Sequence, residues 1–310
     1  MTTHRFFLRM AAVLFLCLPA LFLRAQSRDS VLIISPGLSP AVVPYKRLEL
    51  ALFNQLNTEK SVFRFDTTKE TSRFSALYHV LQIGYGVDKH NRLNIGGTFI
   101  FGHTRSDLDE TRSPFAVLGG GDADATVFHK PAALGIYARG IPFRRLPELT
   151  VQAGVLFPAT DNKLARQFSG YDRTLAQLQF SFYQQFRPWF YLFATAETDL
   201  LFSNSIRKQT TLLLPVSVYP VFRLGYGGKT YLFGNLSYNG RFNKVSPGFL
   251  KSNGYRVWYG LGLQRYFTPD FSAYLQFQLP AAIESVSTTT TTPKGGAFLL
   301  ALGGRWVFRV

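Results

Sequence analysis

The sequence has a single cysteine, few acidic residues and, beyond its first 25 positions, no long apolar run. Cys17 lies in the N-terminal apolar stretch, so the remainder of the chain has no disulfide, thiolate nucleophile or cysteine metal ligand. A spanning helix needs roughly 20 consecutive apolar residues, so the lack of such a run excludes a bundle of membrane helices. The chain is instead rich in Phe (30) and Tyr (15), with a mean hydropathy near zero. This composition suits strands with one apolar and one polar face.

The N-terminus has the features of an export signal. Basic residues come before an apolar stretch at residues 10–23, and Ala25 supplies a small residue for cleavage. The pattern predicts a signal peptide over residues 1–25. A retained membrane anchor is the disfavoured alternative, because the run is short for a span and contains Pro19.

From residue 46 onward the chain breaks into segments in which apolar and polar residues alternate. In residues 271–279, for example, Phe, Ala, Leu, Phe and Leu alternate with Ser, Tyr, Gln and Gln. A period of two predicts strands, and their length exceeds the 5 to 6 residues typical of soluble sandwiches. Twelve strands are predicted, at about 46–57, 73–87, 92–104, 131–142, 148–158, 173–186, 189–202, 210–224, 229–240, 253–267, 270–283 and 296–310.

The connections between these strands are predicted to alternate between short and long, the longest covering about 105–130. Outer-membrane barrels show this asymmetry, with short periplasmic turns and longer extracellular loops. Because lipid offers no partner to a free sheet edge, the first strand must pair with the last. The prediction is an all-β, closed antiparallel transmembrane barrel over residues 46–310, in a bacterial outer membrane with both termini periplasmic. Residues 26–45, with three prolines, are predicted to be a periplasmic tail or a lumen plug.

The last strand ends in a pattern that resembles the C-terminal strand of bacterial outer-membrane barrels. Trp306, Phe308 and Val310 share one face. The resemblance implies recognition by the barrel-assembly machinery, although such strands usually end in an aromatic residue and Val310 departs from that.

Two further features resemble the outer-membrane transporter-like barrels of Bacteroidota. One is the junction of Ala25 and Gln26 after a short signal, and the other is the segment LALFNQLNT at residues 50–58 in the first strand. The resemblance implies a barrel that passes small solutes, and it transfers no catalytic residue.

The charged residues of the strands fall mainly on the inward parity, as expected where a charge facing lipid costs about 2 to 4 kcal/mol. Two interpretations stay open: a lumen filled by ion-paired side chains, or a basic constriction that favours anions. Several arginines lie toward the periplasmic ends, and the acids of the seventh strand lie toward the outer end. The candidate lumen residues are Arg92, Arg139, Arg223, Arg256, Arg305, Arg309, Glu49, Glu197 and Asp199.

The favoured function is a channel or transporter for small solutes, with anions as the candidate class. The first alternative is a non-conducting structural or secretion-assembly barrel. The second is an outer-membrane lipid hydrolase, for which His79 and Ser75 share the outward parity; no family motif supports it, so no enzyme is predicted.

Neither a cofactor nor a metal is expected, because the histidines form no HExxH or HxH pair. The dispersed basic residues argue against nucleic acid. The expected partners are outer-membrane lipid, lipopolysaccharide, the assembly machinery and a small solute.

Overall fold

The computed structural model describes residues 42–65, 68–109, 111–121, 125–204, 208–225, 228–246, 249–285, 292–293 and 297–310. The predicted signal peptide and most of the predicted tail therefore lie outside the described residues.

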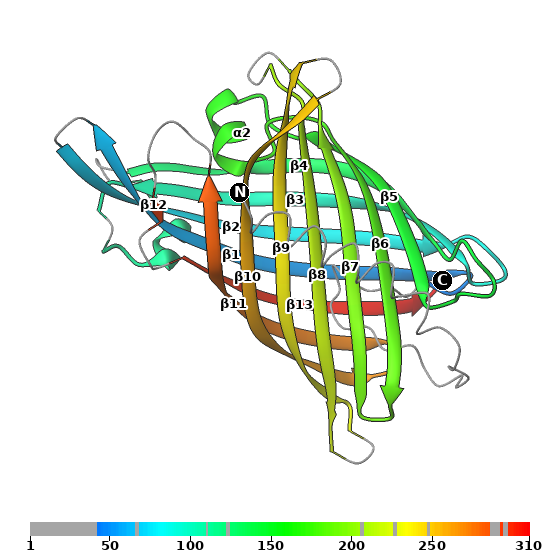
Figure 1. Ribbon diagram of the computed structural model, residues 1–310. Coiled ribbons are helices and arrows are strands. Elements are labelled where there is room, and N and C mark those ends of the chain that lie inside the picture. The colour runs from blue at the N-terminus through cyan, green and yellow to red at the C-terminus, as the bar shows by residue number, and fades with distance from the viewer. Residues whose placement is uncertain are drawn as a thin grey trace. The chain divides into compact units, whose positions relative to one another are not determined.

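The described chain forms one antiparallel sheet that closes on itself (Figure 1). Each long strand pairs with its sequence neighbour, and β13 pairs with β1 to complete the ring. The two-residue β12 adds to the end of β1. The strands are β1 (Arg47–Phe65), β2 (Thr68–Gly86), β3 (Leu93–Asp107), β4 (Ala125–Gly140), β5 (Leu149–Pro158), β6 (Leu175–Arg187), β7 (Phe190–Leu201), β8 (Thr211–Leu224), β9 (Thr230–Ser246), β10 (Phe249–Thr268), β11 (Phe271–Ser285), β12 (Thr292–Pro293) and β13 (Phe298–Arg309).

The predicted fold is confirmed, since twelve long strands form a closed antiparallel barrel. The closure is the predicted one: Leu50 of β1 lies opposite Trp306 of β13. Two short helices lie in connections between strands. They are η3 (Pro114–Leu118), between β3 and β4, and α2 (Lys163–Ser169), between β5 and β6. None of the helices among the described residues is long and apolar enough to cross a membrane.

The prediction of long connections after strands one and nine is wrong. β1 and β2 continue as a paired hairpin to Phe65 and Thr68, and β9 and β10 do the same to Ser246 and Phe249. In these extensions apolar and polar residues no longer alternate regularly. The strands predicted from that alternation therefore ended too early. Backbone pairing does not need an apolar face, and the two strands of a hairpin satisfy each other's hydrogen bonds.

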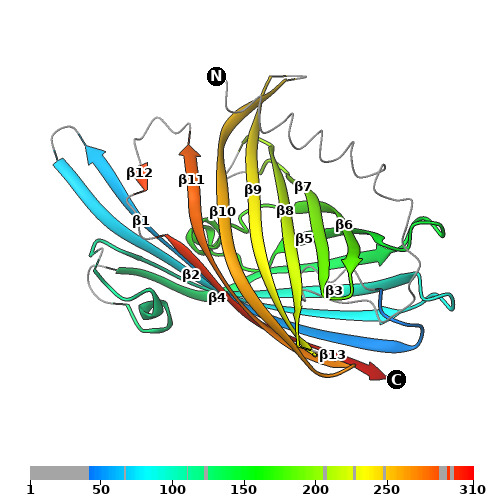
Figure 2. The ribbon, with the colours of Figure 1, turned by 60° about the horizontal axis from the view of Figure 1, so that its bottom comes forward.

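The two ends of the barrel differ. The turn end carries the connections 87–92, 141–148, 188–189 and 269–270, the described residues 225 and 228–229, and the first and last residues of the barrel strands, Arg47 and Arg309. The loop end carries η3, α2 and the extended hairpin of β1 and β2. Figure 2 shows this hairpin reaching beyond the neighbouring strands β3 and β4.

The barrel is apolar on its outer face and largely polar or aromatic inside. Ile136 and Leu261 are 69% and 64% exposed on the outer face, whereas the inward side chains of Phe193 and Phe233 are fully buried. Gly262 makes room for Phe233, because a Cβ there would lie 2.1 Å from a ring atom. A contiguous outward apolar surface of this kind suits contact with lipid rather than water.

Candidate functional site

A buried ion cluster occupies the lumen near the turn end. Glu49 of β1 is fully buried between two arginines: its Oε2 accepts a hydrogen bond from Nε of Arg305 at 2.6 Å, and its Oε1 lies 3.5 Å from a terminal nitrogen of Arg139. Nε of Arg139 donates to Gln152 at 2.8 Å, and its guanidinium lies over the ring of Tyr137. One carboxylate thus serves two guanidinium groups, which leaves a net positive charge in the cluster.

The strands bring these three charges together because of their register. Glu49 and Arg305 lie on adjacent strands, while Arg139 projects from β4, two strands beyond β2 on the other side of β1. Inward parity places each side chain in the lumen, and small residues between them allow the approach. A Cβ on Gly96 would lie 2.5 Å from the ring of Tyr137.

The chain just before β1 packs against this end of the lumen wall. Val43 is fully buried, and the amide of Tyr45 donates to Oδ1 of Asn91 at 2.6 Å. Gly86 permits the contact, since a Cβ there would lie 2.0 Å from the carbonyl oxygen of Pro44. The described residues 42–45 of the predicted tail therefore belong to the barrel's packing.

The α2 connection enters the barrel at the loop end. Its helix begins where Oδ1 of Asn162 accepts a hydrogen bond from the amide of Ala165, and it ends at Gly170 in the left-handed conformation (φ 73°). These are the usual N-cap and C-cap arrangements of a short helix. The caps let seven residues form a defined helix in a connection between two strands.

Aromatic packing holds α2 against β2 and β4. The ring of Phe168 lies 6.3 Å from Phe74 and 5.4 Å from Phe128, measured between centroids. The hydroxyl of Tyr78 donates to the carbonyl of Ser169 at 2.8 Å. Phe74, Tyr78 and Phe128 all lie at inward positions of their strands. The α2 connection therefore narrows the lumen from one side.

Two acidic side chains of β7 lie on the inward face, as predicted. The carboxyl groups of Glu197 and Asp199 are within hydrogen-bonding reach of each other, and Gln177 donates to Glu197. Tyr171, in the connection after α2, lies nearby; burial, followed by repulsion from these acids, raises the pKa of its hydroxyl to about 12. Among the described side chains these acids form no ion pair with the lumen arginines. Of the three predicted lumen acids, only Glu49 forms such ion pairs there.

The other predicted arginines lie apart from the ion cluster. Nε of Arg223 donates to the carbonyl of Gly228 in a turn. Arg256 forms an ion pair of 3.1 Å with Glu59 at the loop end, and Arg309 is exposed at the end of β13. The structure therefore separates the predicted set into one cluster and several isolated positions.

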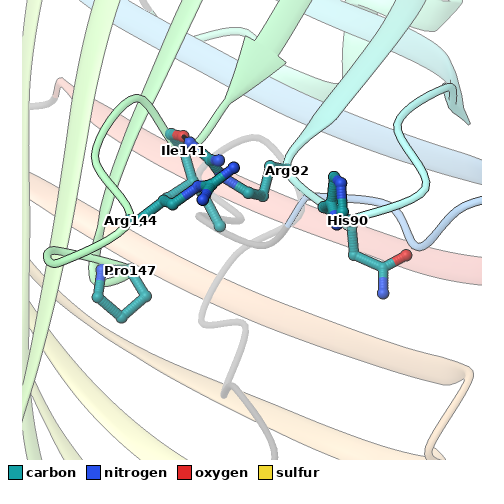
Figure 3. A pocket seen from close by; sticks show the side chains of 6 residues that line it. His90, Arg92, Ile141, Arg144 and Pro147 are labelled. Carbon is teal, nitrogen blue, oxygen red and sulfur yellow. Dashed lines mark hydrogen bonds between the residues drawn. The ribbon is translucent and has the colours of Figure 1, made fainter.

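Arg92 lies at the turn end, immediately before β3, where it lines an open pocket of about 370 Å³ (Figure 3). Its guanidinium donates to the carbonyl of Ile141 at 3.2 Å. His90, Arg144 and Pro147 line the same pocket, which lies between two turns. This basic pocket is separate from the buried cluster.

The outward residues proposed for a lipid hydrolase have separate partners. Oγ of Ser75 is hydrogen bonded to Oγ1 of Thr58 at 3.0 Å, whereas Nδ1 of His79 lies 2.5 Å from Oδ1 of Asn54. Ser75 and His79 are four residues apart on one strand, too far for a direct hydrogen bond between nucleophile and base.

The predicted assembly signal faces outward on β13. The ring of Trp306 stacks on Phe271 with centroids 4.8 Å apart, and Phe308 and Val310 are exposed. This exposure leaves the end of the strand accessible, while its role in assembly stays a prediction.

Several lumen residues were not predicted individually. Gln152 binds Arg139, Asn94 is fully buried beside Gly84, and Phe168 anchors α2. Gln152 and Asn94 lie at inward positions of the alternating pattern, and this pattern could have identified them as lumen residues. Nothing in the local sequence around Phe168 indicates that its loop turns into the barrel.

Comparison with known proteins places the fold among outer-membrane barrels. No protein-family model and no curated protein matches the sequence. Among solved structures, the chain is similar to an outer membrane channel from Pseudomonas putida F1, with a TM-score of 0.59 and 15% identity over 92% of this chain and 100% of that one.

More distant matches are the β domain of a Bordetella autotransporter and the NanC porin. The former has a TM-score of 0.47 and 12% identity over 85% of this chain and 100% of that one. The latter has a TM-score of 0.43 and 8% identity over 82% of this chain and 98% of that one.

Proposed function

We propose that the protein is an outer-membrane channel for small solutes, with anions as its preferred class. The observation that carries the proposal is the cluster of Arg139, Arg305 and Glu49, in which two buried guanidinium groups share one carboxylate. A net positive charge in a narrow lumen attracts anions and repels cations. The likeness in fold to an outer membrane channel supports a conducting role.

The proposal includes an orientation. With short turns on the periplasmic side, both barrel termini lie in the periplasm and the α2 connection faces the cell exterior. Outer-membrane lipid, lipopolysaccharide and the barrel-assembly machinery are then the expected partners. Membership of the Bacteroidota transporter-like barrels rests on the N-terminal junction and residues 50–58.

A non-conducting barrel of a structural or secretion-assembly type is the second candidate. It is favoured by the packing of the lumen, where Glu49, Ala51, Phe193 and Phe233 are fully buried. The two functions differ in one measurable property, the passage of ions.

Planar-bilayer recording of the purified protein in a KCl gradient tests the proposal. We expect discrete conductance steps and a reversal potential of the sign given by chloride selectivity. Replacing both arginines, in R139Q/R305Q, should shift the reversal potential toward cations, while R309Q, at the exposed strand end, should leave it unchanged. Absence of steps in the wild type and in a variant lacking residues 26–41, which keeps the packed residues 42–45, would instead establish the non-conducting barrel.

A further inference from the structure

Three histidines that are far apart in the sequence meet on the outer face of the barrel. His79 of β2, His103 of β3 and His129 of β4 lie side by side, with ring centroids 5.2 Å apart for the first pair and 4.8 Å for the second. The Nδ1 atoms of His103 and His129 are 2.6 Å apart. The fourth histidine of the barrel, His90, lies at the turn end and takes no part.

A β-bulge creates this arrangement. Ile100 of β3 lies opposite Ala133 of β4, but the next residue, Phe101, lies opposite Pro131, so Ala132 is the extra residue. A bulge changes which alternate residues of a strand face outward. Without it, His129 would have the inward parity of Ala133 and could not face His103.

The short distance between two imidazole nitrogens has a chemical consequence. Two lone pairs at 2.6 Å repel, so either one Nδ1 carries a hydrogen and donates it to the other, or a metal ion lies between the two nitrogens. Two imidazole ligands at about 2.0 to 2.1 Å on one tetrahedral Zn²⁺ have nitrogens roughly 3.4 Å apart. The rings of His103 and His129 must therefore separate by roughly 0.8 Å, and the exposure of His129 allows that rotation.

The hydrogen bond of the third imidazole, that of His79, fixes a tautomer that a metal ligand can have. Nδ1 of His79 lies 2.5 Å from the carbonyl oxygen Oδ1 of Asn54, which accepts its N–H. Nε2 then carries the lone pair. A ligating histidine commonly donates its other N–H to an oxygen in this way, which fixes the ring and its tautomer.

We propose that His103, His129 and His79 bind a divalent transition-metal ion such as Zn²⁺ on the outer wall of the barrel. Imidazole nitrogens suit Zn²⁺, Cu²⁺ and Ni²⁺, and not Mg²⁺ or Ca²⁺. Among the described residues no three His, Cys, Asp or Glu side chains already surround one point. Binding therefore requires rotation of the imidazoles on a fixed sheet.

The test is metal binding by the untagged, full-length barrel in detergent, with Zn²⁺ titrated against a chromophoric chelator. We expect one equivalent of Zn²⁺ per barrel, and at least a tenfold weaker affinity in H103F. H90Q is the matched control and should bind as the wild type does. N54A should weaken binding by 10- to 100-fold through loss of the orienting hydrogen bond.

Folding of each variant is checked by its migration on a gel before and after heating, since folded barrels resist unfolding by detergent. For Cu²⁺, nitrogen hyperfine coupling in the electron paramagnetic resonance spectrum should report imidazole ligands and should disappear in H103F. If the wild type takes up no stoichiometric Zn²⁺, or if folded H103F and N54A bind as tightly as H90Q, a shared proton explains the short distance and the metal site is refuted.

Discussion

Replacement of Glu49 by Gln isolates the buried ion cluster. The variant keeps the size of the side chain but removes the only carboxylate that contacts Arg305 and Arg139 among the described residues, at 2.6 Å and 3.5 Å. A unit charge pair at about 4 Å in an effective dielectric of about 20 interacts by roughly 4 kcal/mol. Loss of one partner from a buried pair costs about 3 to 5 kcal/mol, because the remaining charge stays desolvated. We therefore expect E49Q to lose about 3 to 5 kcal/mol of folding free energy.

Urea titration of the barrel in lipid vesicles, followed by tryptophan fluorescence, measures this loss. E59Q is the control, because Glu59 pairs with Arg256 at 3.1 Å through side chains that are 22% and 48% exposed. Such a pair is screened by solvent and is worth about 0 to 1 kcal/mol. E49Q should also increase chloride selectivity, since the cluster then carries two uncompensated positive charges.

A loss below about 1 kcal/mol in E49Q, equal to that in E59Q, would refute the reasoning. It would mean that the arginines find water in the lumen when the carboxylate is removed. The triple variant E49Q/R139Q/R305Q provides a further check. It should recover part of the lost stability, because no unpaired charge stays buried.

Three further predictions concern the lipid face, α2 and the segment before β1. I136R should destabilise the barrel in vesicles by about 2 to 4 kcal/mol if Ile136 faces the bilayer interior, whereas L108R, in an exposed loop, should be neutral by the same urea titration. F168A should increase single-channel conductance because α2 loses its packing, and L164A, at an exposed position of the same helix, should not. G86A should displace residues 42–45, since its Cβ would lie 2.0 Å from a backbone carbonyl there; faster proteolysis of this segment than in the wild type would confirm it.

Most of the strand pattern could be predicted because its cause is local. Each strand must present one face to lipid and one to the lumen, and this imposes a period of two that the sequence displays directly. The inward positions of Glu49, Arg139 and Arg305 followed from the same parity. The extension of β1 and β2 to Phe65 and Thr68 did not follow, because pairing there relies on backbone hydrogen bonds, which leave little trace in composition.

The sequence by itself determined the strand number, the order of the strands and the face on which most charged residues lie, whereas the export signal at the N-terminus stays a prediction. Only the tertiary structure decided which charges meet. Closure of the sheet brings Glu49 between Arg305 and Arg139, and a single bulged residue, Ala132, turns His129 toward His103. Contacts of this kind depend on register between strands that are distant in sequence, and alternation along one strand contains no information about register with another.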